Sequence, residues 1–259
     1  MFSYSAECMG TVFLFQVDDN ISEDELSRFC DGAMDVLRDA DETFSLYKPE
    51  SEISQLNAGA ASWDSASSVQ RKIRADATDW KAITGGFFDS VSPDGTYDPS
   101  GLVKSWAARN GAQYLEANGV RQFTLNAGGD IYLSQDLTSP LLNKVGLSNL
   151  RSVADAAAGS NMVLDLAGSK FRAVATSGRS ERGEHIWRAA DSSDYIQATV
   201  VAKDLVVADI WATALISGGA EALKLFVETV SSADAVALVT AADMSFVATT
   251  GFATVLATV

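Results

Sequence analysis

The stretch from Lys203 to Gly219, KDLVVADIWATALISGG, constrains the fold more than any other part of the sequence. It follows a β-rich run at 196–201, and the two glycines that close it are a typical stop signal for a helix. Most of its residues are apolar, so the predicted helix should be buried on nearly all sides. The rest of the chain must therefore supply a core on several sides of this helix.

Two polar residues interrupt this apolar helix. Asp209 and Thr213 are four residues apart, so both side-chain oxygens should point to one helix face. A buried carboxylate needs a partner, and a hard cation such as Mg²⁺, which prefers oxygen ligands, would serve. In the other interpretation Asp209 forms an ordinary ion pair with Lys203 or Arg188, and Thr213 bonds back to its own helix. This stretch alone leaves both interpretations open.

Length and charge limit the classes of function. The chain has 259 residues, 47% of them hydrophobic, which is enough for one large domain or two closely packed lobes. We expect a single domain over residues 1–259. The formal net charge of -15 argues against binding nucleic acid or an anionic membrane surface. A ligand that carries phosphates would need a local cation, backbone N–H groups or a few basic side chains.

Cysteine and histidine content excludes two further classes. Cys8 and Cys30 do not make a disulfide framework, and the single histidine, His185, excludes a metal site built from several histidines. The first ten residues show no signal-peptide pattern, and no apolar run reaches the length expected of a membrane span. From these patterns we expect a cytoplasmic protein.

Helices and strands are mixed without regular βαβ alternation, which predicts an α+β fold. Two helices are expected from their caps: one from a capping box at Ser22–Glu25 to about Ala40, and a short one from Ser51 to Leu56. A third should follow the polar patch Ala58–Ser68 and end near Thr84. Further helices are expected at Lys104–Asn118, Lys203–Gly219 and Ala220–Val230. Strands are expected at Thr11–Val17, either side of a Gly-Gly turn in Phe123–Leu133, and at Met162–Leu166, Phe171–Thr176, Ile196–Val201, Val236–Val239, Phe246–Ala248 and Ala253–Leu256.

Three further segments could carry chemistry. The motif NAGGD at 126–130 has paired glycines that let a backbone approach phosphate, although a tight hairpin explains it equally well. The segment at 176–185 combines hydroxyls and glycines with two arginines and His185, which is either structural or a general base. In DPSGLVK, at 98–104, Asp98 and Lys104 lie around a turn that enters a helix; either the N-terminal end of this helix attracts an anion, or Asp98 or Ser100 is an ordinary helix cap. Rossmann, P-loop and GxSxG motifs are absent.

Seven motifs in order along the chain resemble the FAD:protein FMN transferases, also called the ApbE family. They are Met9-Gly10-Thr11, FSLYKPESEISQLN at 44–57, Gly86-Phe87-Phe88-Asp89, DPSGLVKSWAA at 98–108, NAGGDI at 126–131, ATSGRSERGEHI at 175–186 and VVADIWATAL at 206–215. The resemblance implies the family's α+β fold with mostly antiparallel sheets and packed helices. It also implies a Mg²⁺-dependent reaction on FAD.

The resemblance assigns roles to particular residues. The metal ligands would be the backbone carbonyl of Gly101 and the side chains of Asp209 and Thr213. Positions that bind the flavin nucleotide would be Met9, Tyr47, Phe87, Phe88, Asp89, Asp98, Lys104, Gly128, Gly129, Ser177, Gly178 and His185.

Family members cleave the FAD pyrophosphate, transfer FMN to a threonine of a partner protein and release AMP. His185 would act as the base for the threonine hydroxyl, with Asp209 as the alternative, and Lys104 would assist. Two other functions stay open: an FAD pyrophosphatase, and a flavin-binding protein that has lost transfer. An unrelated binding domain would require the motif order to be coincidental.

Three positions depart from the family pattern. Val103-Lys104-Ser105 stands in place of AKG, Asn110 replaces an aspartate, and the segment after His185 lacks DPxTG. These changes touch the flavin pocket more than the metal ligands. No acceptor motif is evident in the chain, so self-flavinylation is not expected.

Overall fold

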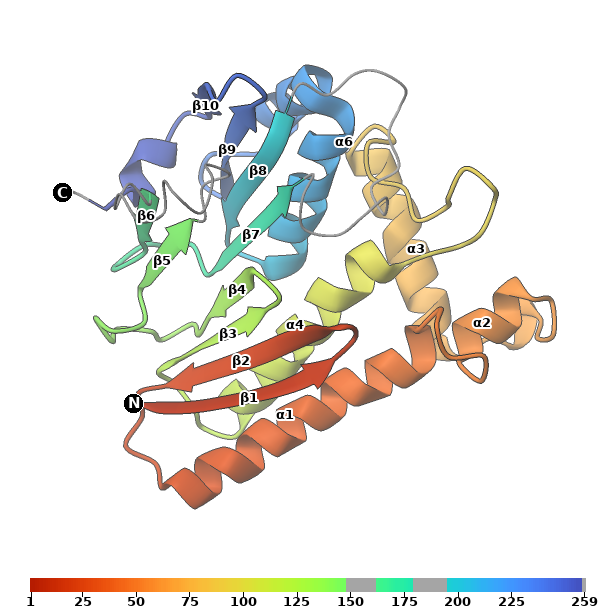
Figure 1. Cartoon of the computed structure of the whole chain (residues 1–259), viewed down its shortest axis with the longest axis horizontal. Helices are drawn as coiled ribbons and strands as arrows, with labels where there is room; N and C mark the ends of the chain where they lie inside the picture. Colours follow the sequence, from red (N-terminus) through yellow and green to blue (C-terminus); the bar gives the residue numbers. More distant parts are fainter. Residues whose placement is uncertain (148–161, 179–194, 258–259) are drawn as a thin grey trace.

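An eight-stranded antiparallel sheet forms the centre of the molecule (Figure 1). The computed structural model describes residues 1–147, 162–178 and 195–257. In spatial order the sheet consists of β1 (Phe2–Cys8), β2 (Thr11–Val17), β3 (Phe123–Ala127), β4 (Asp130–Leu133), β7 (Ala173–Gly178), β8 (Tyr195–Ala202), β9 (Ala235–Ala241) and β10 (Phe246–Ala248). A separate hairpin pairs β5 (Lys144–Leu147) with β6 (Met162–Asp165). The predicted α+β class, mostly antiparallel, is confirmed.

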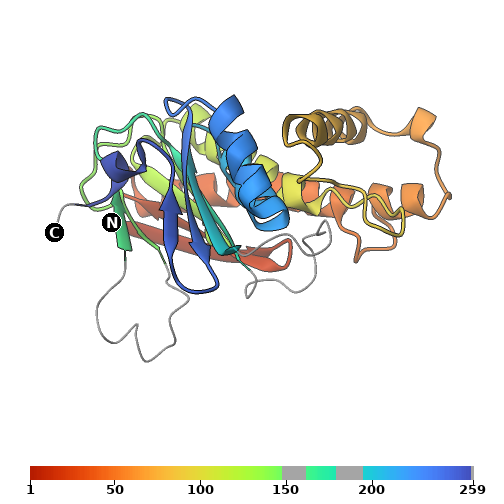
Figure 2. The same cartoon turned by 90° about the horizontal axis from the view of Figure 1, so that it is seen from above.

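Helices pack against one face of this sheet (Figure 2). The helices that contact its strands are α1 (Glu23–Phe44), α4 (Ser100–Ala117) and α6 (Leu205–Thr229). The other two, α2 (Glu52–Asn57) and α3 (Ser68–Ile83), pack on α1 and α4 respectively, and short 3₁₀ turns lie at Trp63–Ser65 and Phe252–Val255. Helix α6 lies on β7 and β8, and α4 contacts both α1 and α6. The helix predicted from Lys203 thus occupies the centre of the fold, as its apolar sequence requires.

Both faces of the central strands are buried, and each face has its own hydrophobic cluster. In β9, Ala237 and Val239 belong to the cluster under the helices, whereas Val236 and Leu238 belong to a second cluster on the opposite face. The second cluster also contains residues of the β5–β6 hairpin. Successive side chains of a strand point to opposite faces, so burial of both faces explains why β8 and β9 are nearly continuous apolar runs.

Helix α6 is longer than predicted. The sequence predicted two helices, but one element runs from Leu205 to Thr229 with a kink at Gly219, whose φ of 56° and ψ of -134° are not helical. By length and composition it could cross a membrane, which corrects the expectation that no segment reaches that length. Trp211 and most of its neighbours are buried in the core, as in the central helix of a soluble fold.

The helix starts follow the predicted capping chemistry. The hydroxyl of Ser22 accepts the Glu25 N–H and donates to the Glu25 carboxylate, and Ser51 accepts the Ser54 N–H. Helix α4 begins at Ser100, earlier than predicted, because Asp98 Oδ1 accepts the Ser100 N–H at 2.9 Å.

Two strand predictions failed. The edge strand β1 was missed because its outward positions are polar. The strand predicted at Ala253–Leu256 is wrong, because Phe252–Val255 forms a 3₁₀ turn that inserts Phe252 and Val255 into the second cluster.

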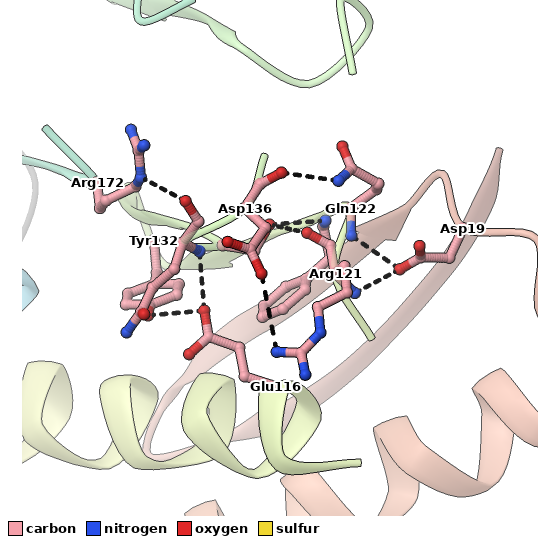
Figure 3. Close-up of polar contacts among 10 residues, drawn as sticks. Asp19, Glu116, Arg121, Gln122, Tyr132, Asp136 and Arg172 are labelled. Atoms are coloured by element: carbon pink, nitrogen blue, oxygen red, sulfur yellow. Dashed lines mark hydrogen bonds and ion pairs between the residues drawn. The ribbon is translucent and has the colours of Figure 1, made fainter. Parts of the chain in front are cut away.

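A polar network fastens the strands at the end where α4 leads into β3 (Figure 3). One oxygen of Asp19 accepts the backbone N–H groups of both Arg121 and Gln122, at 2.6 and 2.8 Å. One oxygen of Glu116 accepts the Tyr132 hydroxyl at 3.1 Å and the Gln135 N–H at 2.9 Å. These bonds fix α4 against β3 and β4, and so fix where the first turn of α4 lies.

Gly218 is a position where packing should tolerate no side chain. A Cβ on Gly218 would lie 2.2 Å from Cδ1 of Phe87, whereas a Cβ on Gly146 would meet nothing within 4 Å. We expect Gly218→Ala to lower the free energy of unfolding by about 1–3 kcal/mol, because overpacking forces the Phe87 ring to move. Urea unfolding measures this, with Gly146→Ala as the matched control. Equal stabilities of the two variants would contradict the prediction.

Candidate active site

The topology brings two glycine-containing turns and the end of a third strand to one end of the sheet. Strands β1 and β2 are joined by Met9–Gly10, and β3 and β4 by Gly128–Gly129. Because β7 runs antiparallel to β4, it ends at the same side with Ser177 and Gly178. The Gly128 N–H bonds to the Val12 carbonyl at 3.2 Å, which ties the first two turns together. We call this region the hairpin end of the sheet.

Two helices point charged side chains toward the hairpin end. Helix α4 leads into the far end of β3, so its first turn, with Gly101 and Lys104, lies at the hairpin end. Helix α6 begins after β8 has run away from the hairpin end, and it returns toward that end through Asp209 and Thr213. Two contacts confirm this: Lys104 hydrogen-bonds Asp130, and Thr213 Oγ1 lies 3.3 Å from Ser177 Oγ.

Three buried charges meet there. The Lys104 ammonium hydrogen-bonds Asp130 Oδ2 and lies 3.5 Å from Asp209 Oδ2. The two aspartates are only 2% and 5% exposed. Of the partners expected for an ordinary ion pair, Lys203 instead bonds Asp234 at 2.7 Å, and Arg188 lies outside the described residues. Asp209 therefore faces a cation on α4 that the sequence did not indicate.

The cluster of Lys104, Asp130 and Asp209 has more negative than positive charge. The pKa of Asp130 is raised to about 6, first by burial and then by the Asp209 carboxylate, although Lys104 and the Thr176 N–H act in the opposite direction. One ammonium cannot neutralise two carboxylates, so with both ionised these three side chains carry a surplus negative charge. A further cation at this place would be electrostatically favourable.

The donor atoms around Asp209 suit a hard cation. Asp209 Oδ2 is buried and accepts no hydrogen bond from the part of the chain that the structure describes, since the Lys104 ammonium at 3.5 Å makes only a long ionic contact. The Thr213 hydroxyl is one helical turn further, and Gly101 lies three residues before Lys104 on the same face of α4. Oxygen donors of this kind are those that Mg²⁺ prefers. Within the described ranges, no group of three or more His, Cys, Asp or Glu side chains could hold a metal, so a cation beside Asp209 would need hydroxyl, carbonyl, water or ligand oxygens as well.

The segment from Phe87 to Asp89 is held mainly by the fold. The Phe87 ring packs against Gly218, and Phe88 is buried against Gly101. Asp89 Oδ1 accepts the Val91 N–H at 3.0 Å, and its other oxygen pairs with Lys81 at 2.6 Å. These residues join the start of α4 to the kink of α6, so any contact with a flavin would come in addition to these roles.

Of the remaining predicted contact residues, one is exposed and three form turns. Tyr47 is 84% exposed, and Met9, with the positive φ of 51° that is rare outside glycine, forms the β1–β2 turn. Gly128 and Gly129 form a two-residue hairpin turn with φ of 63° and 103°, so the expected hairpin is present and their contact with a nucleotide stays a prediction. His185 falls outside the described residues.

Asp130 belongs to the motif NAGGD, but no role was predicted for its side chain. Its Oδ1 accepts the Thr176 N–H at 3.2 Å while Oδ2 bonds Lys104. The signal was an aspartate directly after a Gly-Gly turn, at the first position of a strand. Only the pairing of β4 with β7 shows that this carboxylate is buried beside α4 and α6.

Solved structures have the same fold. The flavin transferase ApbE from Vibrio cholerae is 17% identical, with a TM-score of 0.78 and coverage of 98% of this chain and 99% of that chain. The ApbE protein from Thermotoga maritima is 15% identical, with a TM-score of 0.76 and coverage of 99% of each chain. The flavinyl transferase ApbE from Pseudomonas stutzeri is 15% identical, with a TM-score of 0.76 and coverage of 99% and 97%. No curated protein matches the sequence.

The sequence also matches a family model directly. The model of the ApbE family matches residues 90–237, which is more than half of the chain. The matched region contains α4, the β3–β4 turn and the part of α6 that carries Asp209 and Thr213. The chain therefore belongs to the ApbE family.

Proposed function

We propose that the protein is a Mg²⁺-dependent FAD:protein FMN transferase that attaches FMN to a threonine of a partner protein and releases AMP. One observation carries the proposal: a buried site of surplus negative charge, with an unpartnered oxygen on Asp209, at the end of the sheet where the family motifs meet. The similar structures from Vibrio cholerae and Pseudomonas stutzeri are named as flavin transferases, which supports the same reaction class.

Gly101, Asp209 and Thr213 would hold the cation through a backbone carbonyl, a carboxylate and a hydroxyl. When bound, Mg²⁺ would neutralise charge on the FAD pyrophosphate and orient it, which also answers how so acidic a protein binds a phosphorylated ligand. The unpartnered Asp209 oxygen makes the residues present compatible with this role.

The other side chains of the site have separate tasks. Lys104 supplies a positive charge near the pyrophosphate, and Asp130 orients that ammonium. The acceptor threonine oxygen bonds to the FMN phosphorus as the phosphorus–oxygen bond to AMP breaks. AMP leaves with that bridging oxygen, and the threonine proton passes to a base. His185 is our candidate base, on the sequence alone.

We also propose that residues 1–259 form a single domain. The cluster under the helices draws on Phe13 and Phe15 near one end of the chain and on Val239 near the other. A core shared by both ends of the chain does not favour a division into two independent lobes. The cytoplasmic location stays a prediction from the sequence.

The proposed reaction gives a direct test with Asp209→Asn. We expect the purified protein to release AMP from FAD only with Mg²⁺, and to attach FMN to an acceptor protein, seen by chromatography and mass spectrometry. Asp209→Asn should reduce AMP release at least about 100-fold, because an amide cannot replace the carboxylate ligand. Asp234→Asn, the same change at an exposed ion pair, is the control and should be unaffected.

The same assay separates the alternatives. AMP and free FMN without an attached flavin, even with acceptor present, would indicate an FAD pyrophosphatase. Bound but intact FAD in the presence of acceptor and Mg²⁺ would indicate a flavin-binding protein without transfer. Full turnover by Asp209→Asn would refute the metal assignment.

The hydroxyl of Thr213 can be tested with a matched pair on the same helix. Thr213→Val should weaken the binding of Mg²⁺, so the Mg²⁺ concentration that gives half-maximal turnover should rise by about 10-fold or more. Thr229→Val is the control, because the Thr229 hydroxyl bonds only its own helix, to the Leu225 carbonyl at 2.7 Å, far along α6. Similar Mg²⁺ curves for both variants would remove Thr213 from the proposed ligands.

Lys104 should matter for stability as well as for activity. Lys104→Met leaves two buried carboxylates without this ammonium, so the free energy of unfolding should fall by about 3–5 kcal/mol. Asp209→Asn should lower the free energy of unfolding far less, because it leaves one carboxylate for one ammonium. Denaturant unfolding without divalent ions measures both. A larger loss for Asp209→Asn than for Lys104→Met would contradict this account of the charges.

A further inference from the structure

Lys104 does not divide its charge equally between the two carboxylates that flank it. Its ammonium hydrogen-bonds Oδ2 of Asp130, whereas Oδ2 of Asp209 is 3.5 Å away and forms no hydrogen bond with any described residue. Both carboxylates are buried, at 2% and 5% exposure, so burial alone does not explain the difference. Something in the fold directs the ammonium to Asp130.

The backbone fixes Asp130 at this place. It is the first residue of β4 and pairs with Ala127 across the hairpin turn. Its Oδ1 accepts the backbone N–H of Thr176, on β7, at 3.2 Å. Its Oδ2 is thereby held toward α4 and Lys104. Lys104, by contrast, carries its charge on a flexible four-carbon side chain that can follow the position of its partner.

Removing the Asp130 charge would change where the ammonium lies. Asp209 Oδ2 is already within 3.5 Å, and attraction between opposite charges is strong in a buried setting of low permittivity. A small movement of the side chain would bring the ammonium into hydrogen-bonding distance of Asp209. It would then occupy the acceptor oxygen that a divalent cation needs.

We propose that Asp130 is a positioning residue that holds the Lys104 ammonium away from Asp209 and so keeps the Asp209 carboxylate open for a divalent cation. The inference rests on the proposed function, because it takes the site at Asp209 as the cation site. It adds a division of labour between two buried aspartates: one engages the protein's own cation, and the other receives the external one.

A double-mutant cycle tests this division. The four proteins are wild type, Asp130→Asn, Lys104→Met and the double variant, each confirmed as folded by circular dichroism. The probe is Mn²⁺ alone, without FAD, titrated by electron paramagnetic resonance of the free ion, because Mn²⁺ accepts the same oxygen ligands. Asp136→Asn, a change at an exposed aspartate, is the control for a general loss of negative charge.

The expected result is non-additive. Asp130→Asn should weaken Mn²⁺ binding by about 10-fold or more, and Asp136→Asn should not. Lys104→Met should then strengthen Mn²⁺ binding more in the Asp130→Asn protein than in the wild-type protein. The ratio of these two effects should be at least about five. The reason is that Lys104 competes for Asp209 only when Asp130 no longer holds it.

Two results would overturn the inference in different ways. If Lys104→Met strengthens Mn²⁺ binding in the Asp130→Asn protein by no more than in the wild-type protein, Asp130 acts only as a nearby charge or as a ligand. If the wild-type protein binds no Mn²⁺ at millimolar concentration, the proposed cation site fails and the inference fails with it.

A structure gives a second, independent readout. In crystals of Asp130→Asn without metal, the Lys104 ammonium should lie within hydrogen-bonding distance of Asp209 Oδ2. An ammonium that stays beside residue 130, or turns away from both positions, would refute the role given to Asp130 even if metal affinity changes.

Discussion

The contact of one ammonium with two buried carboxylates is the interaction on which the rest of this site depends. Lys104 comes from α4, Asp130 from the β3–β4 hairpin and Asp209 from α6, so the contact joins three parts of the fold. Buried charge is costly unless it is paired, and here the pairing is incomplete. In the function that we propose, this incomplete pairing is what favours a further cation.

The packing of the surrounding elements holds this contact in place. Helix α4 is anchored at its far end by Glu116 and the network shown in Figure 3, and α6 is buried along most of its length. At the kink of α6, Gly218 admits the Phe87 ring, which ties the segment leading to α4 onto α6. The charged residues are thus fixed by packing more than by their own bonds.

The two glycine-containing turns at the hairpin end serve a shared geometric purpose. Met9–Gly10 and Gly128–Gly129 both have positive φ, which allows tight turns and leaves little side-chain bulk at the second position of each. Antiparallel pairing then places these turns and the end of β7 side by side, next to the first turn of α4. A long phosphorylated ligand such as FAD would find backbone groups and a charged cluster along one continuous end of the sheet.

The sequence alone determined the local elements, the family and the polar face of α6. Capping residues such as Ser22 and Ser51 mark helix starts, and the spacing of Asp209 and Thr213 puts both on one helix face, because these signals act within a few residues. Tertiary structure decided that Asp209 meets Lys104 and not Lys203, and that Asp130 is buried between β7 and α4. Such contacts depend on strand order and helix packing across more than 100 residues, for example between Lys104 and Asp209, and no local pattern encodes them.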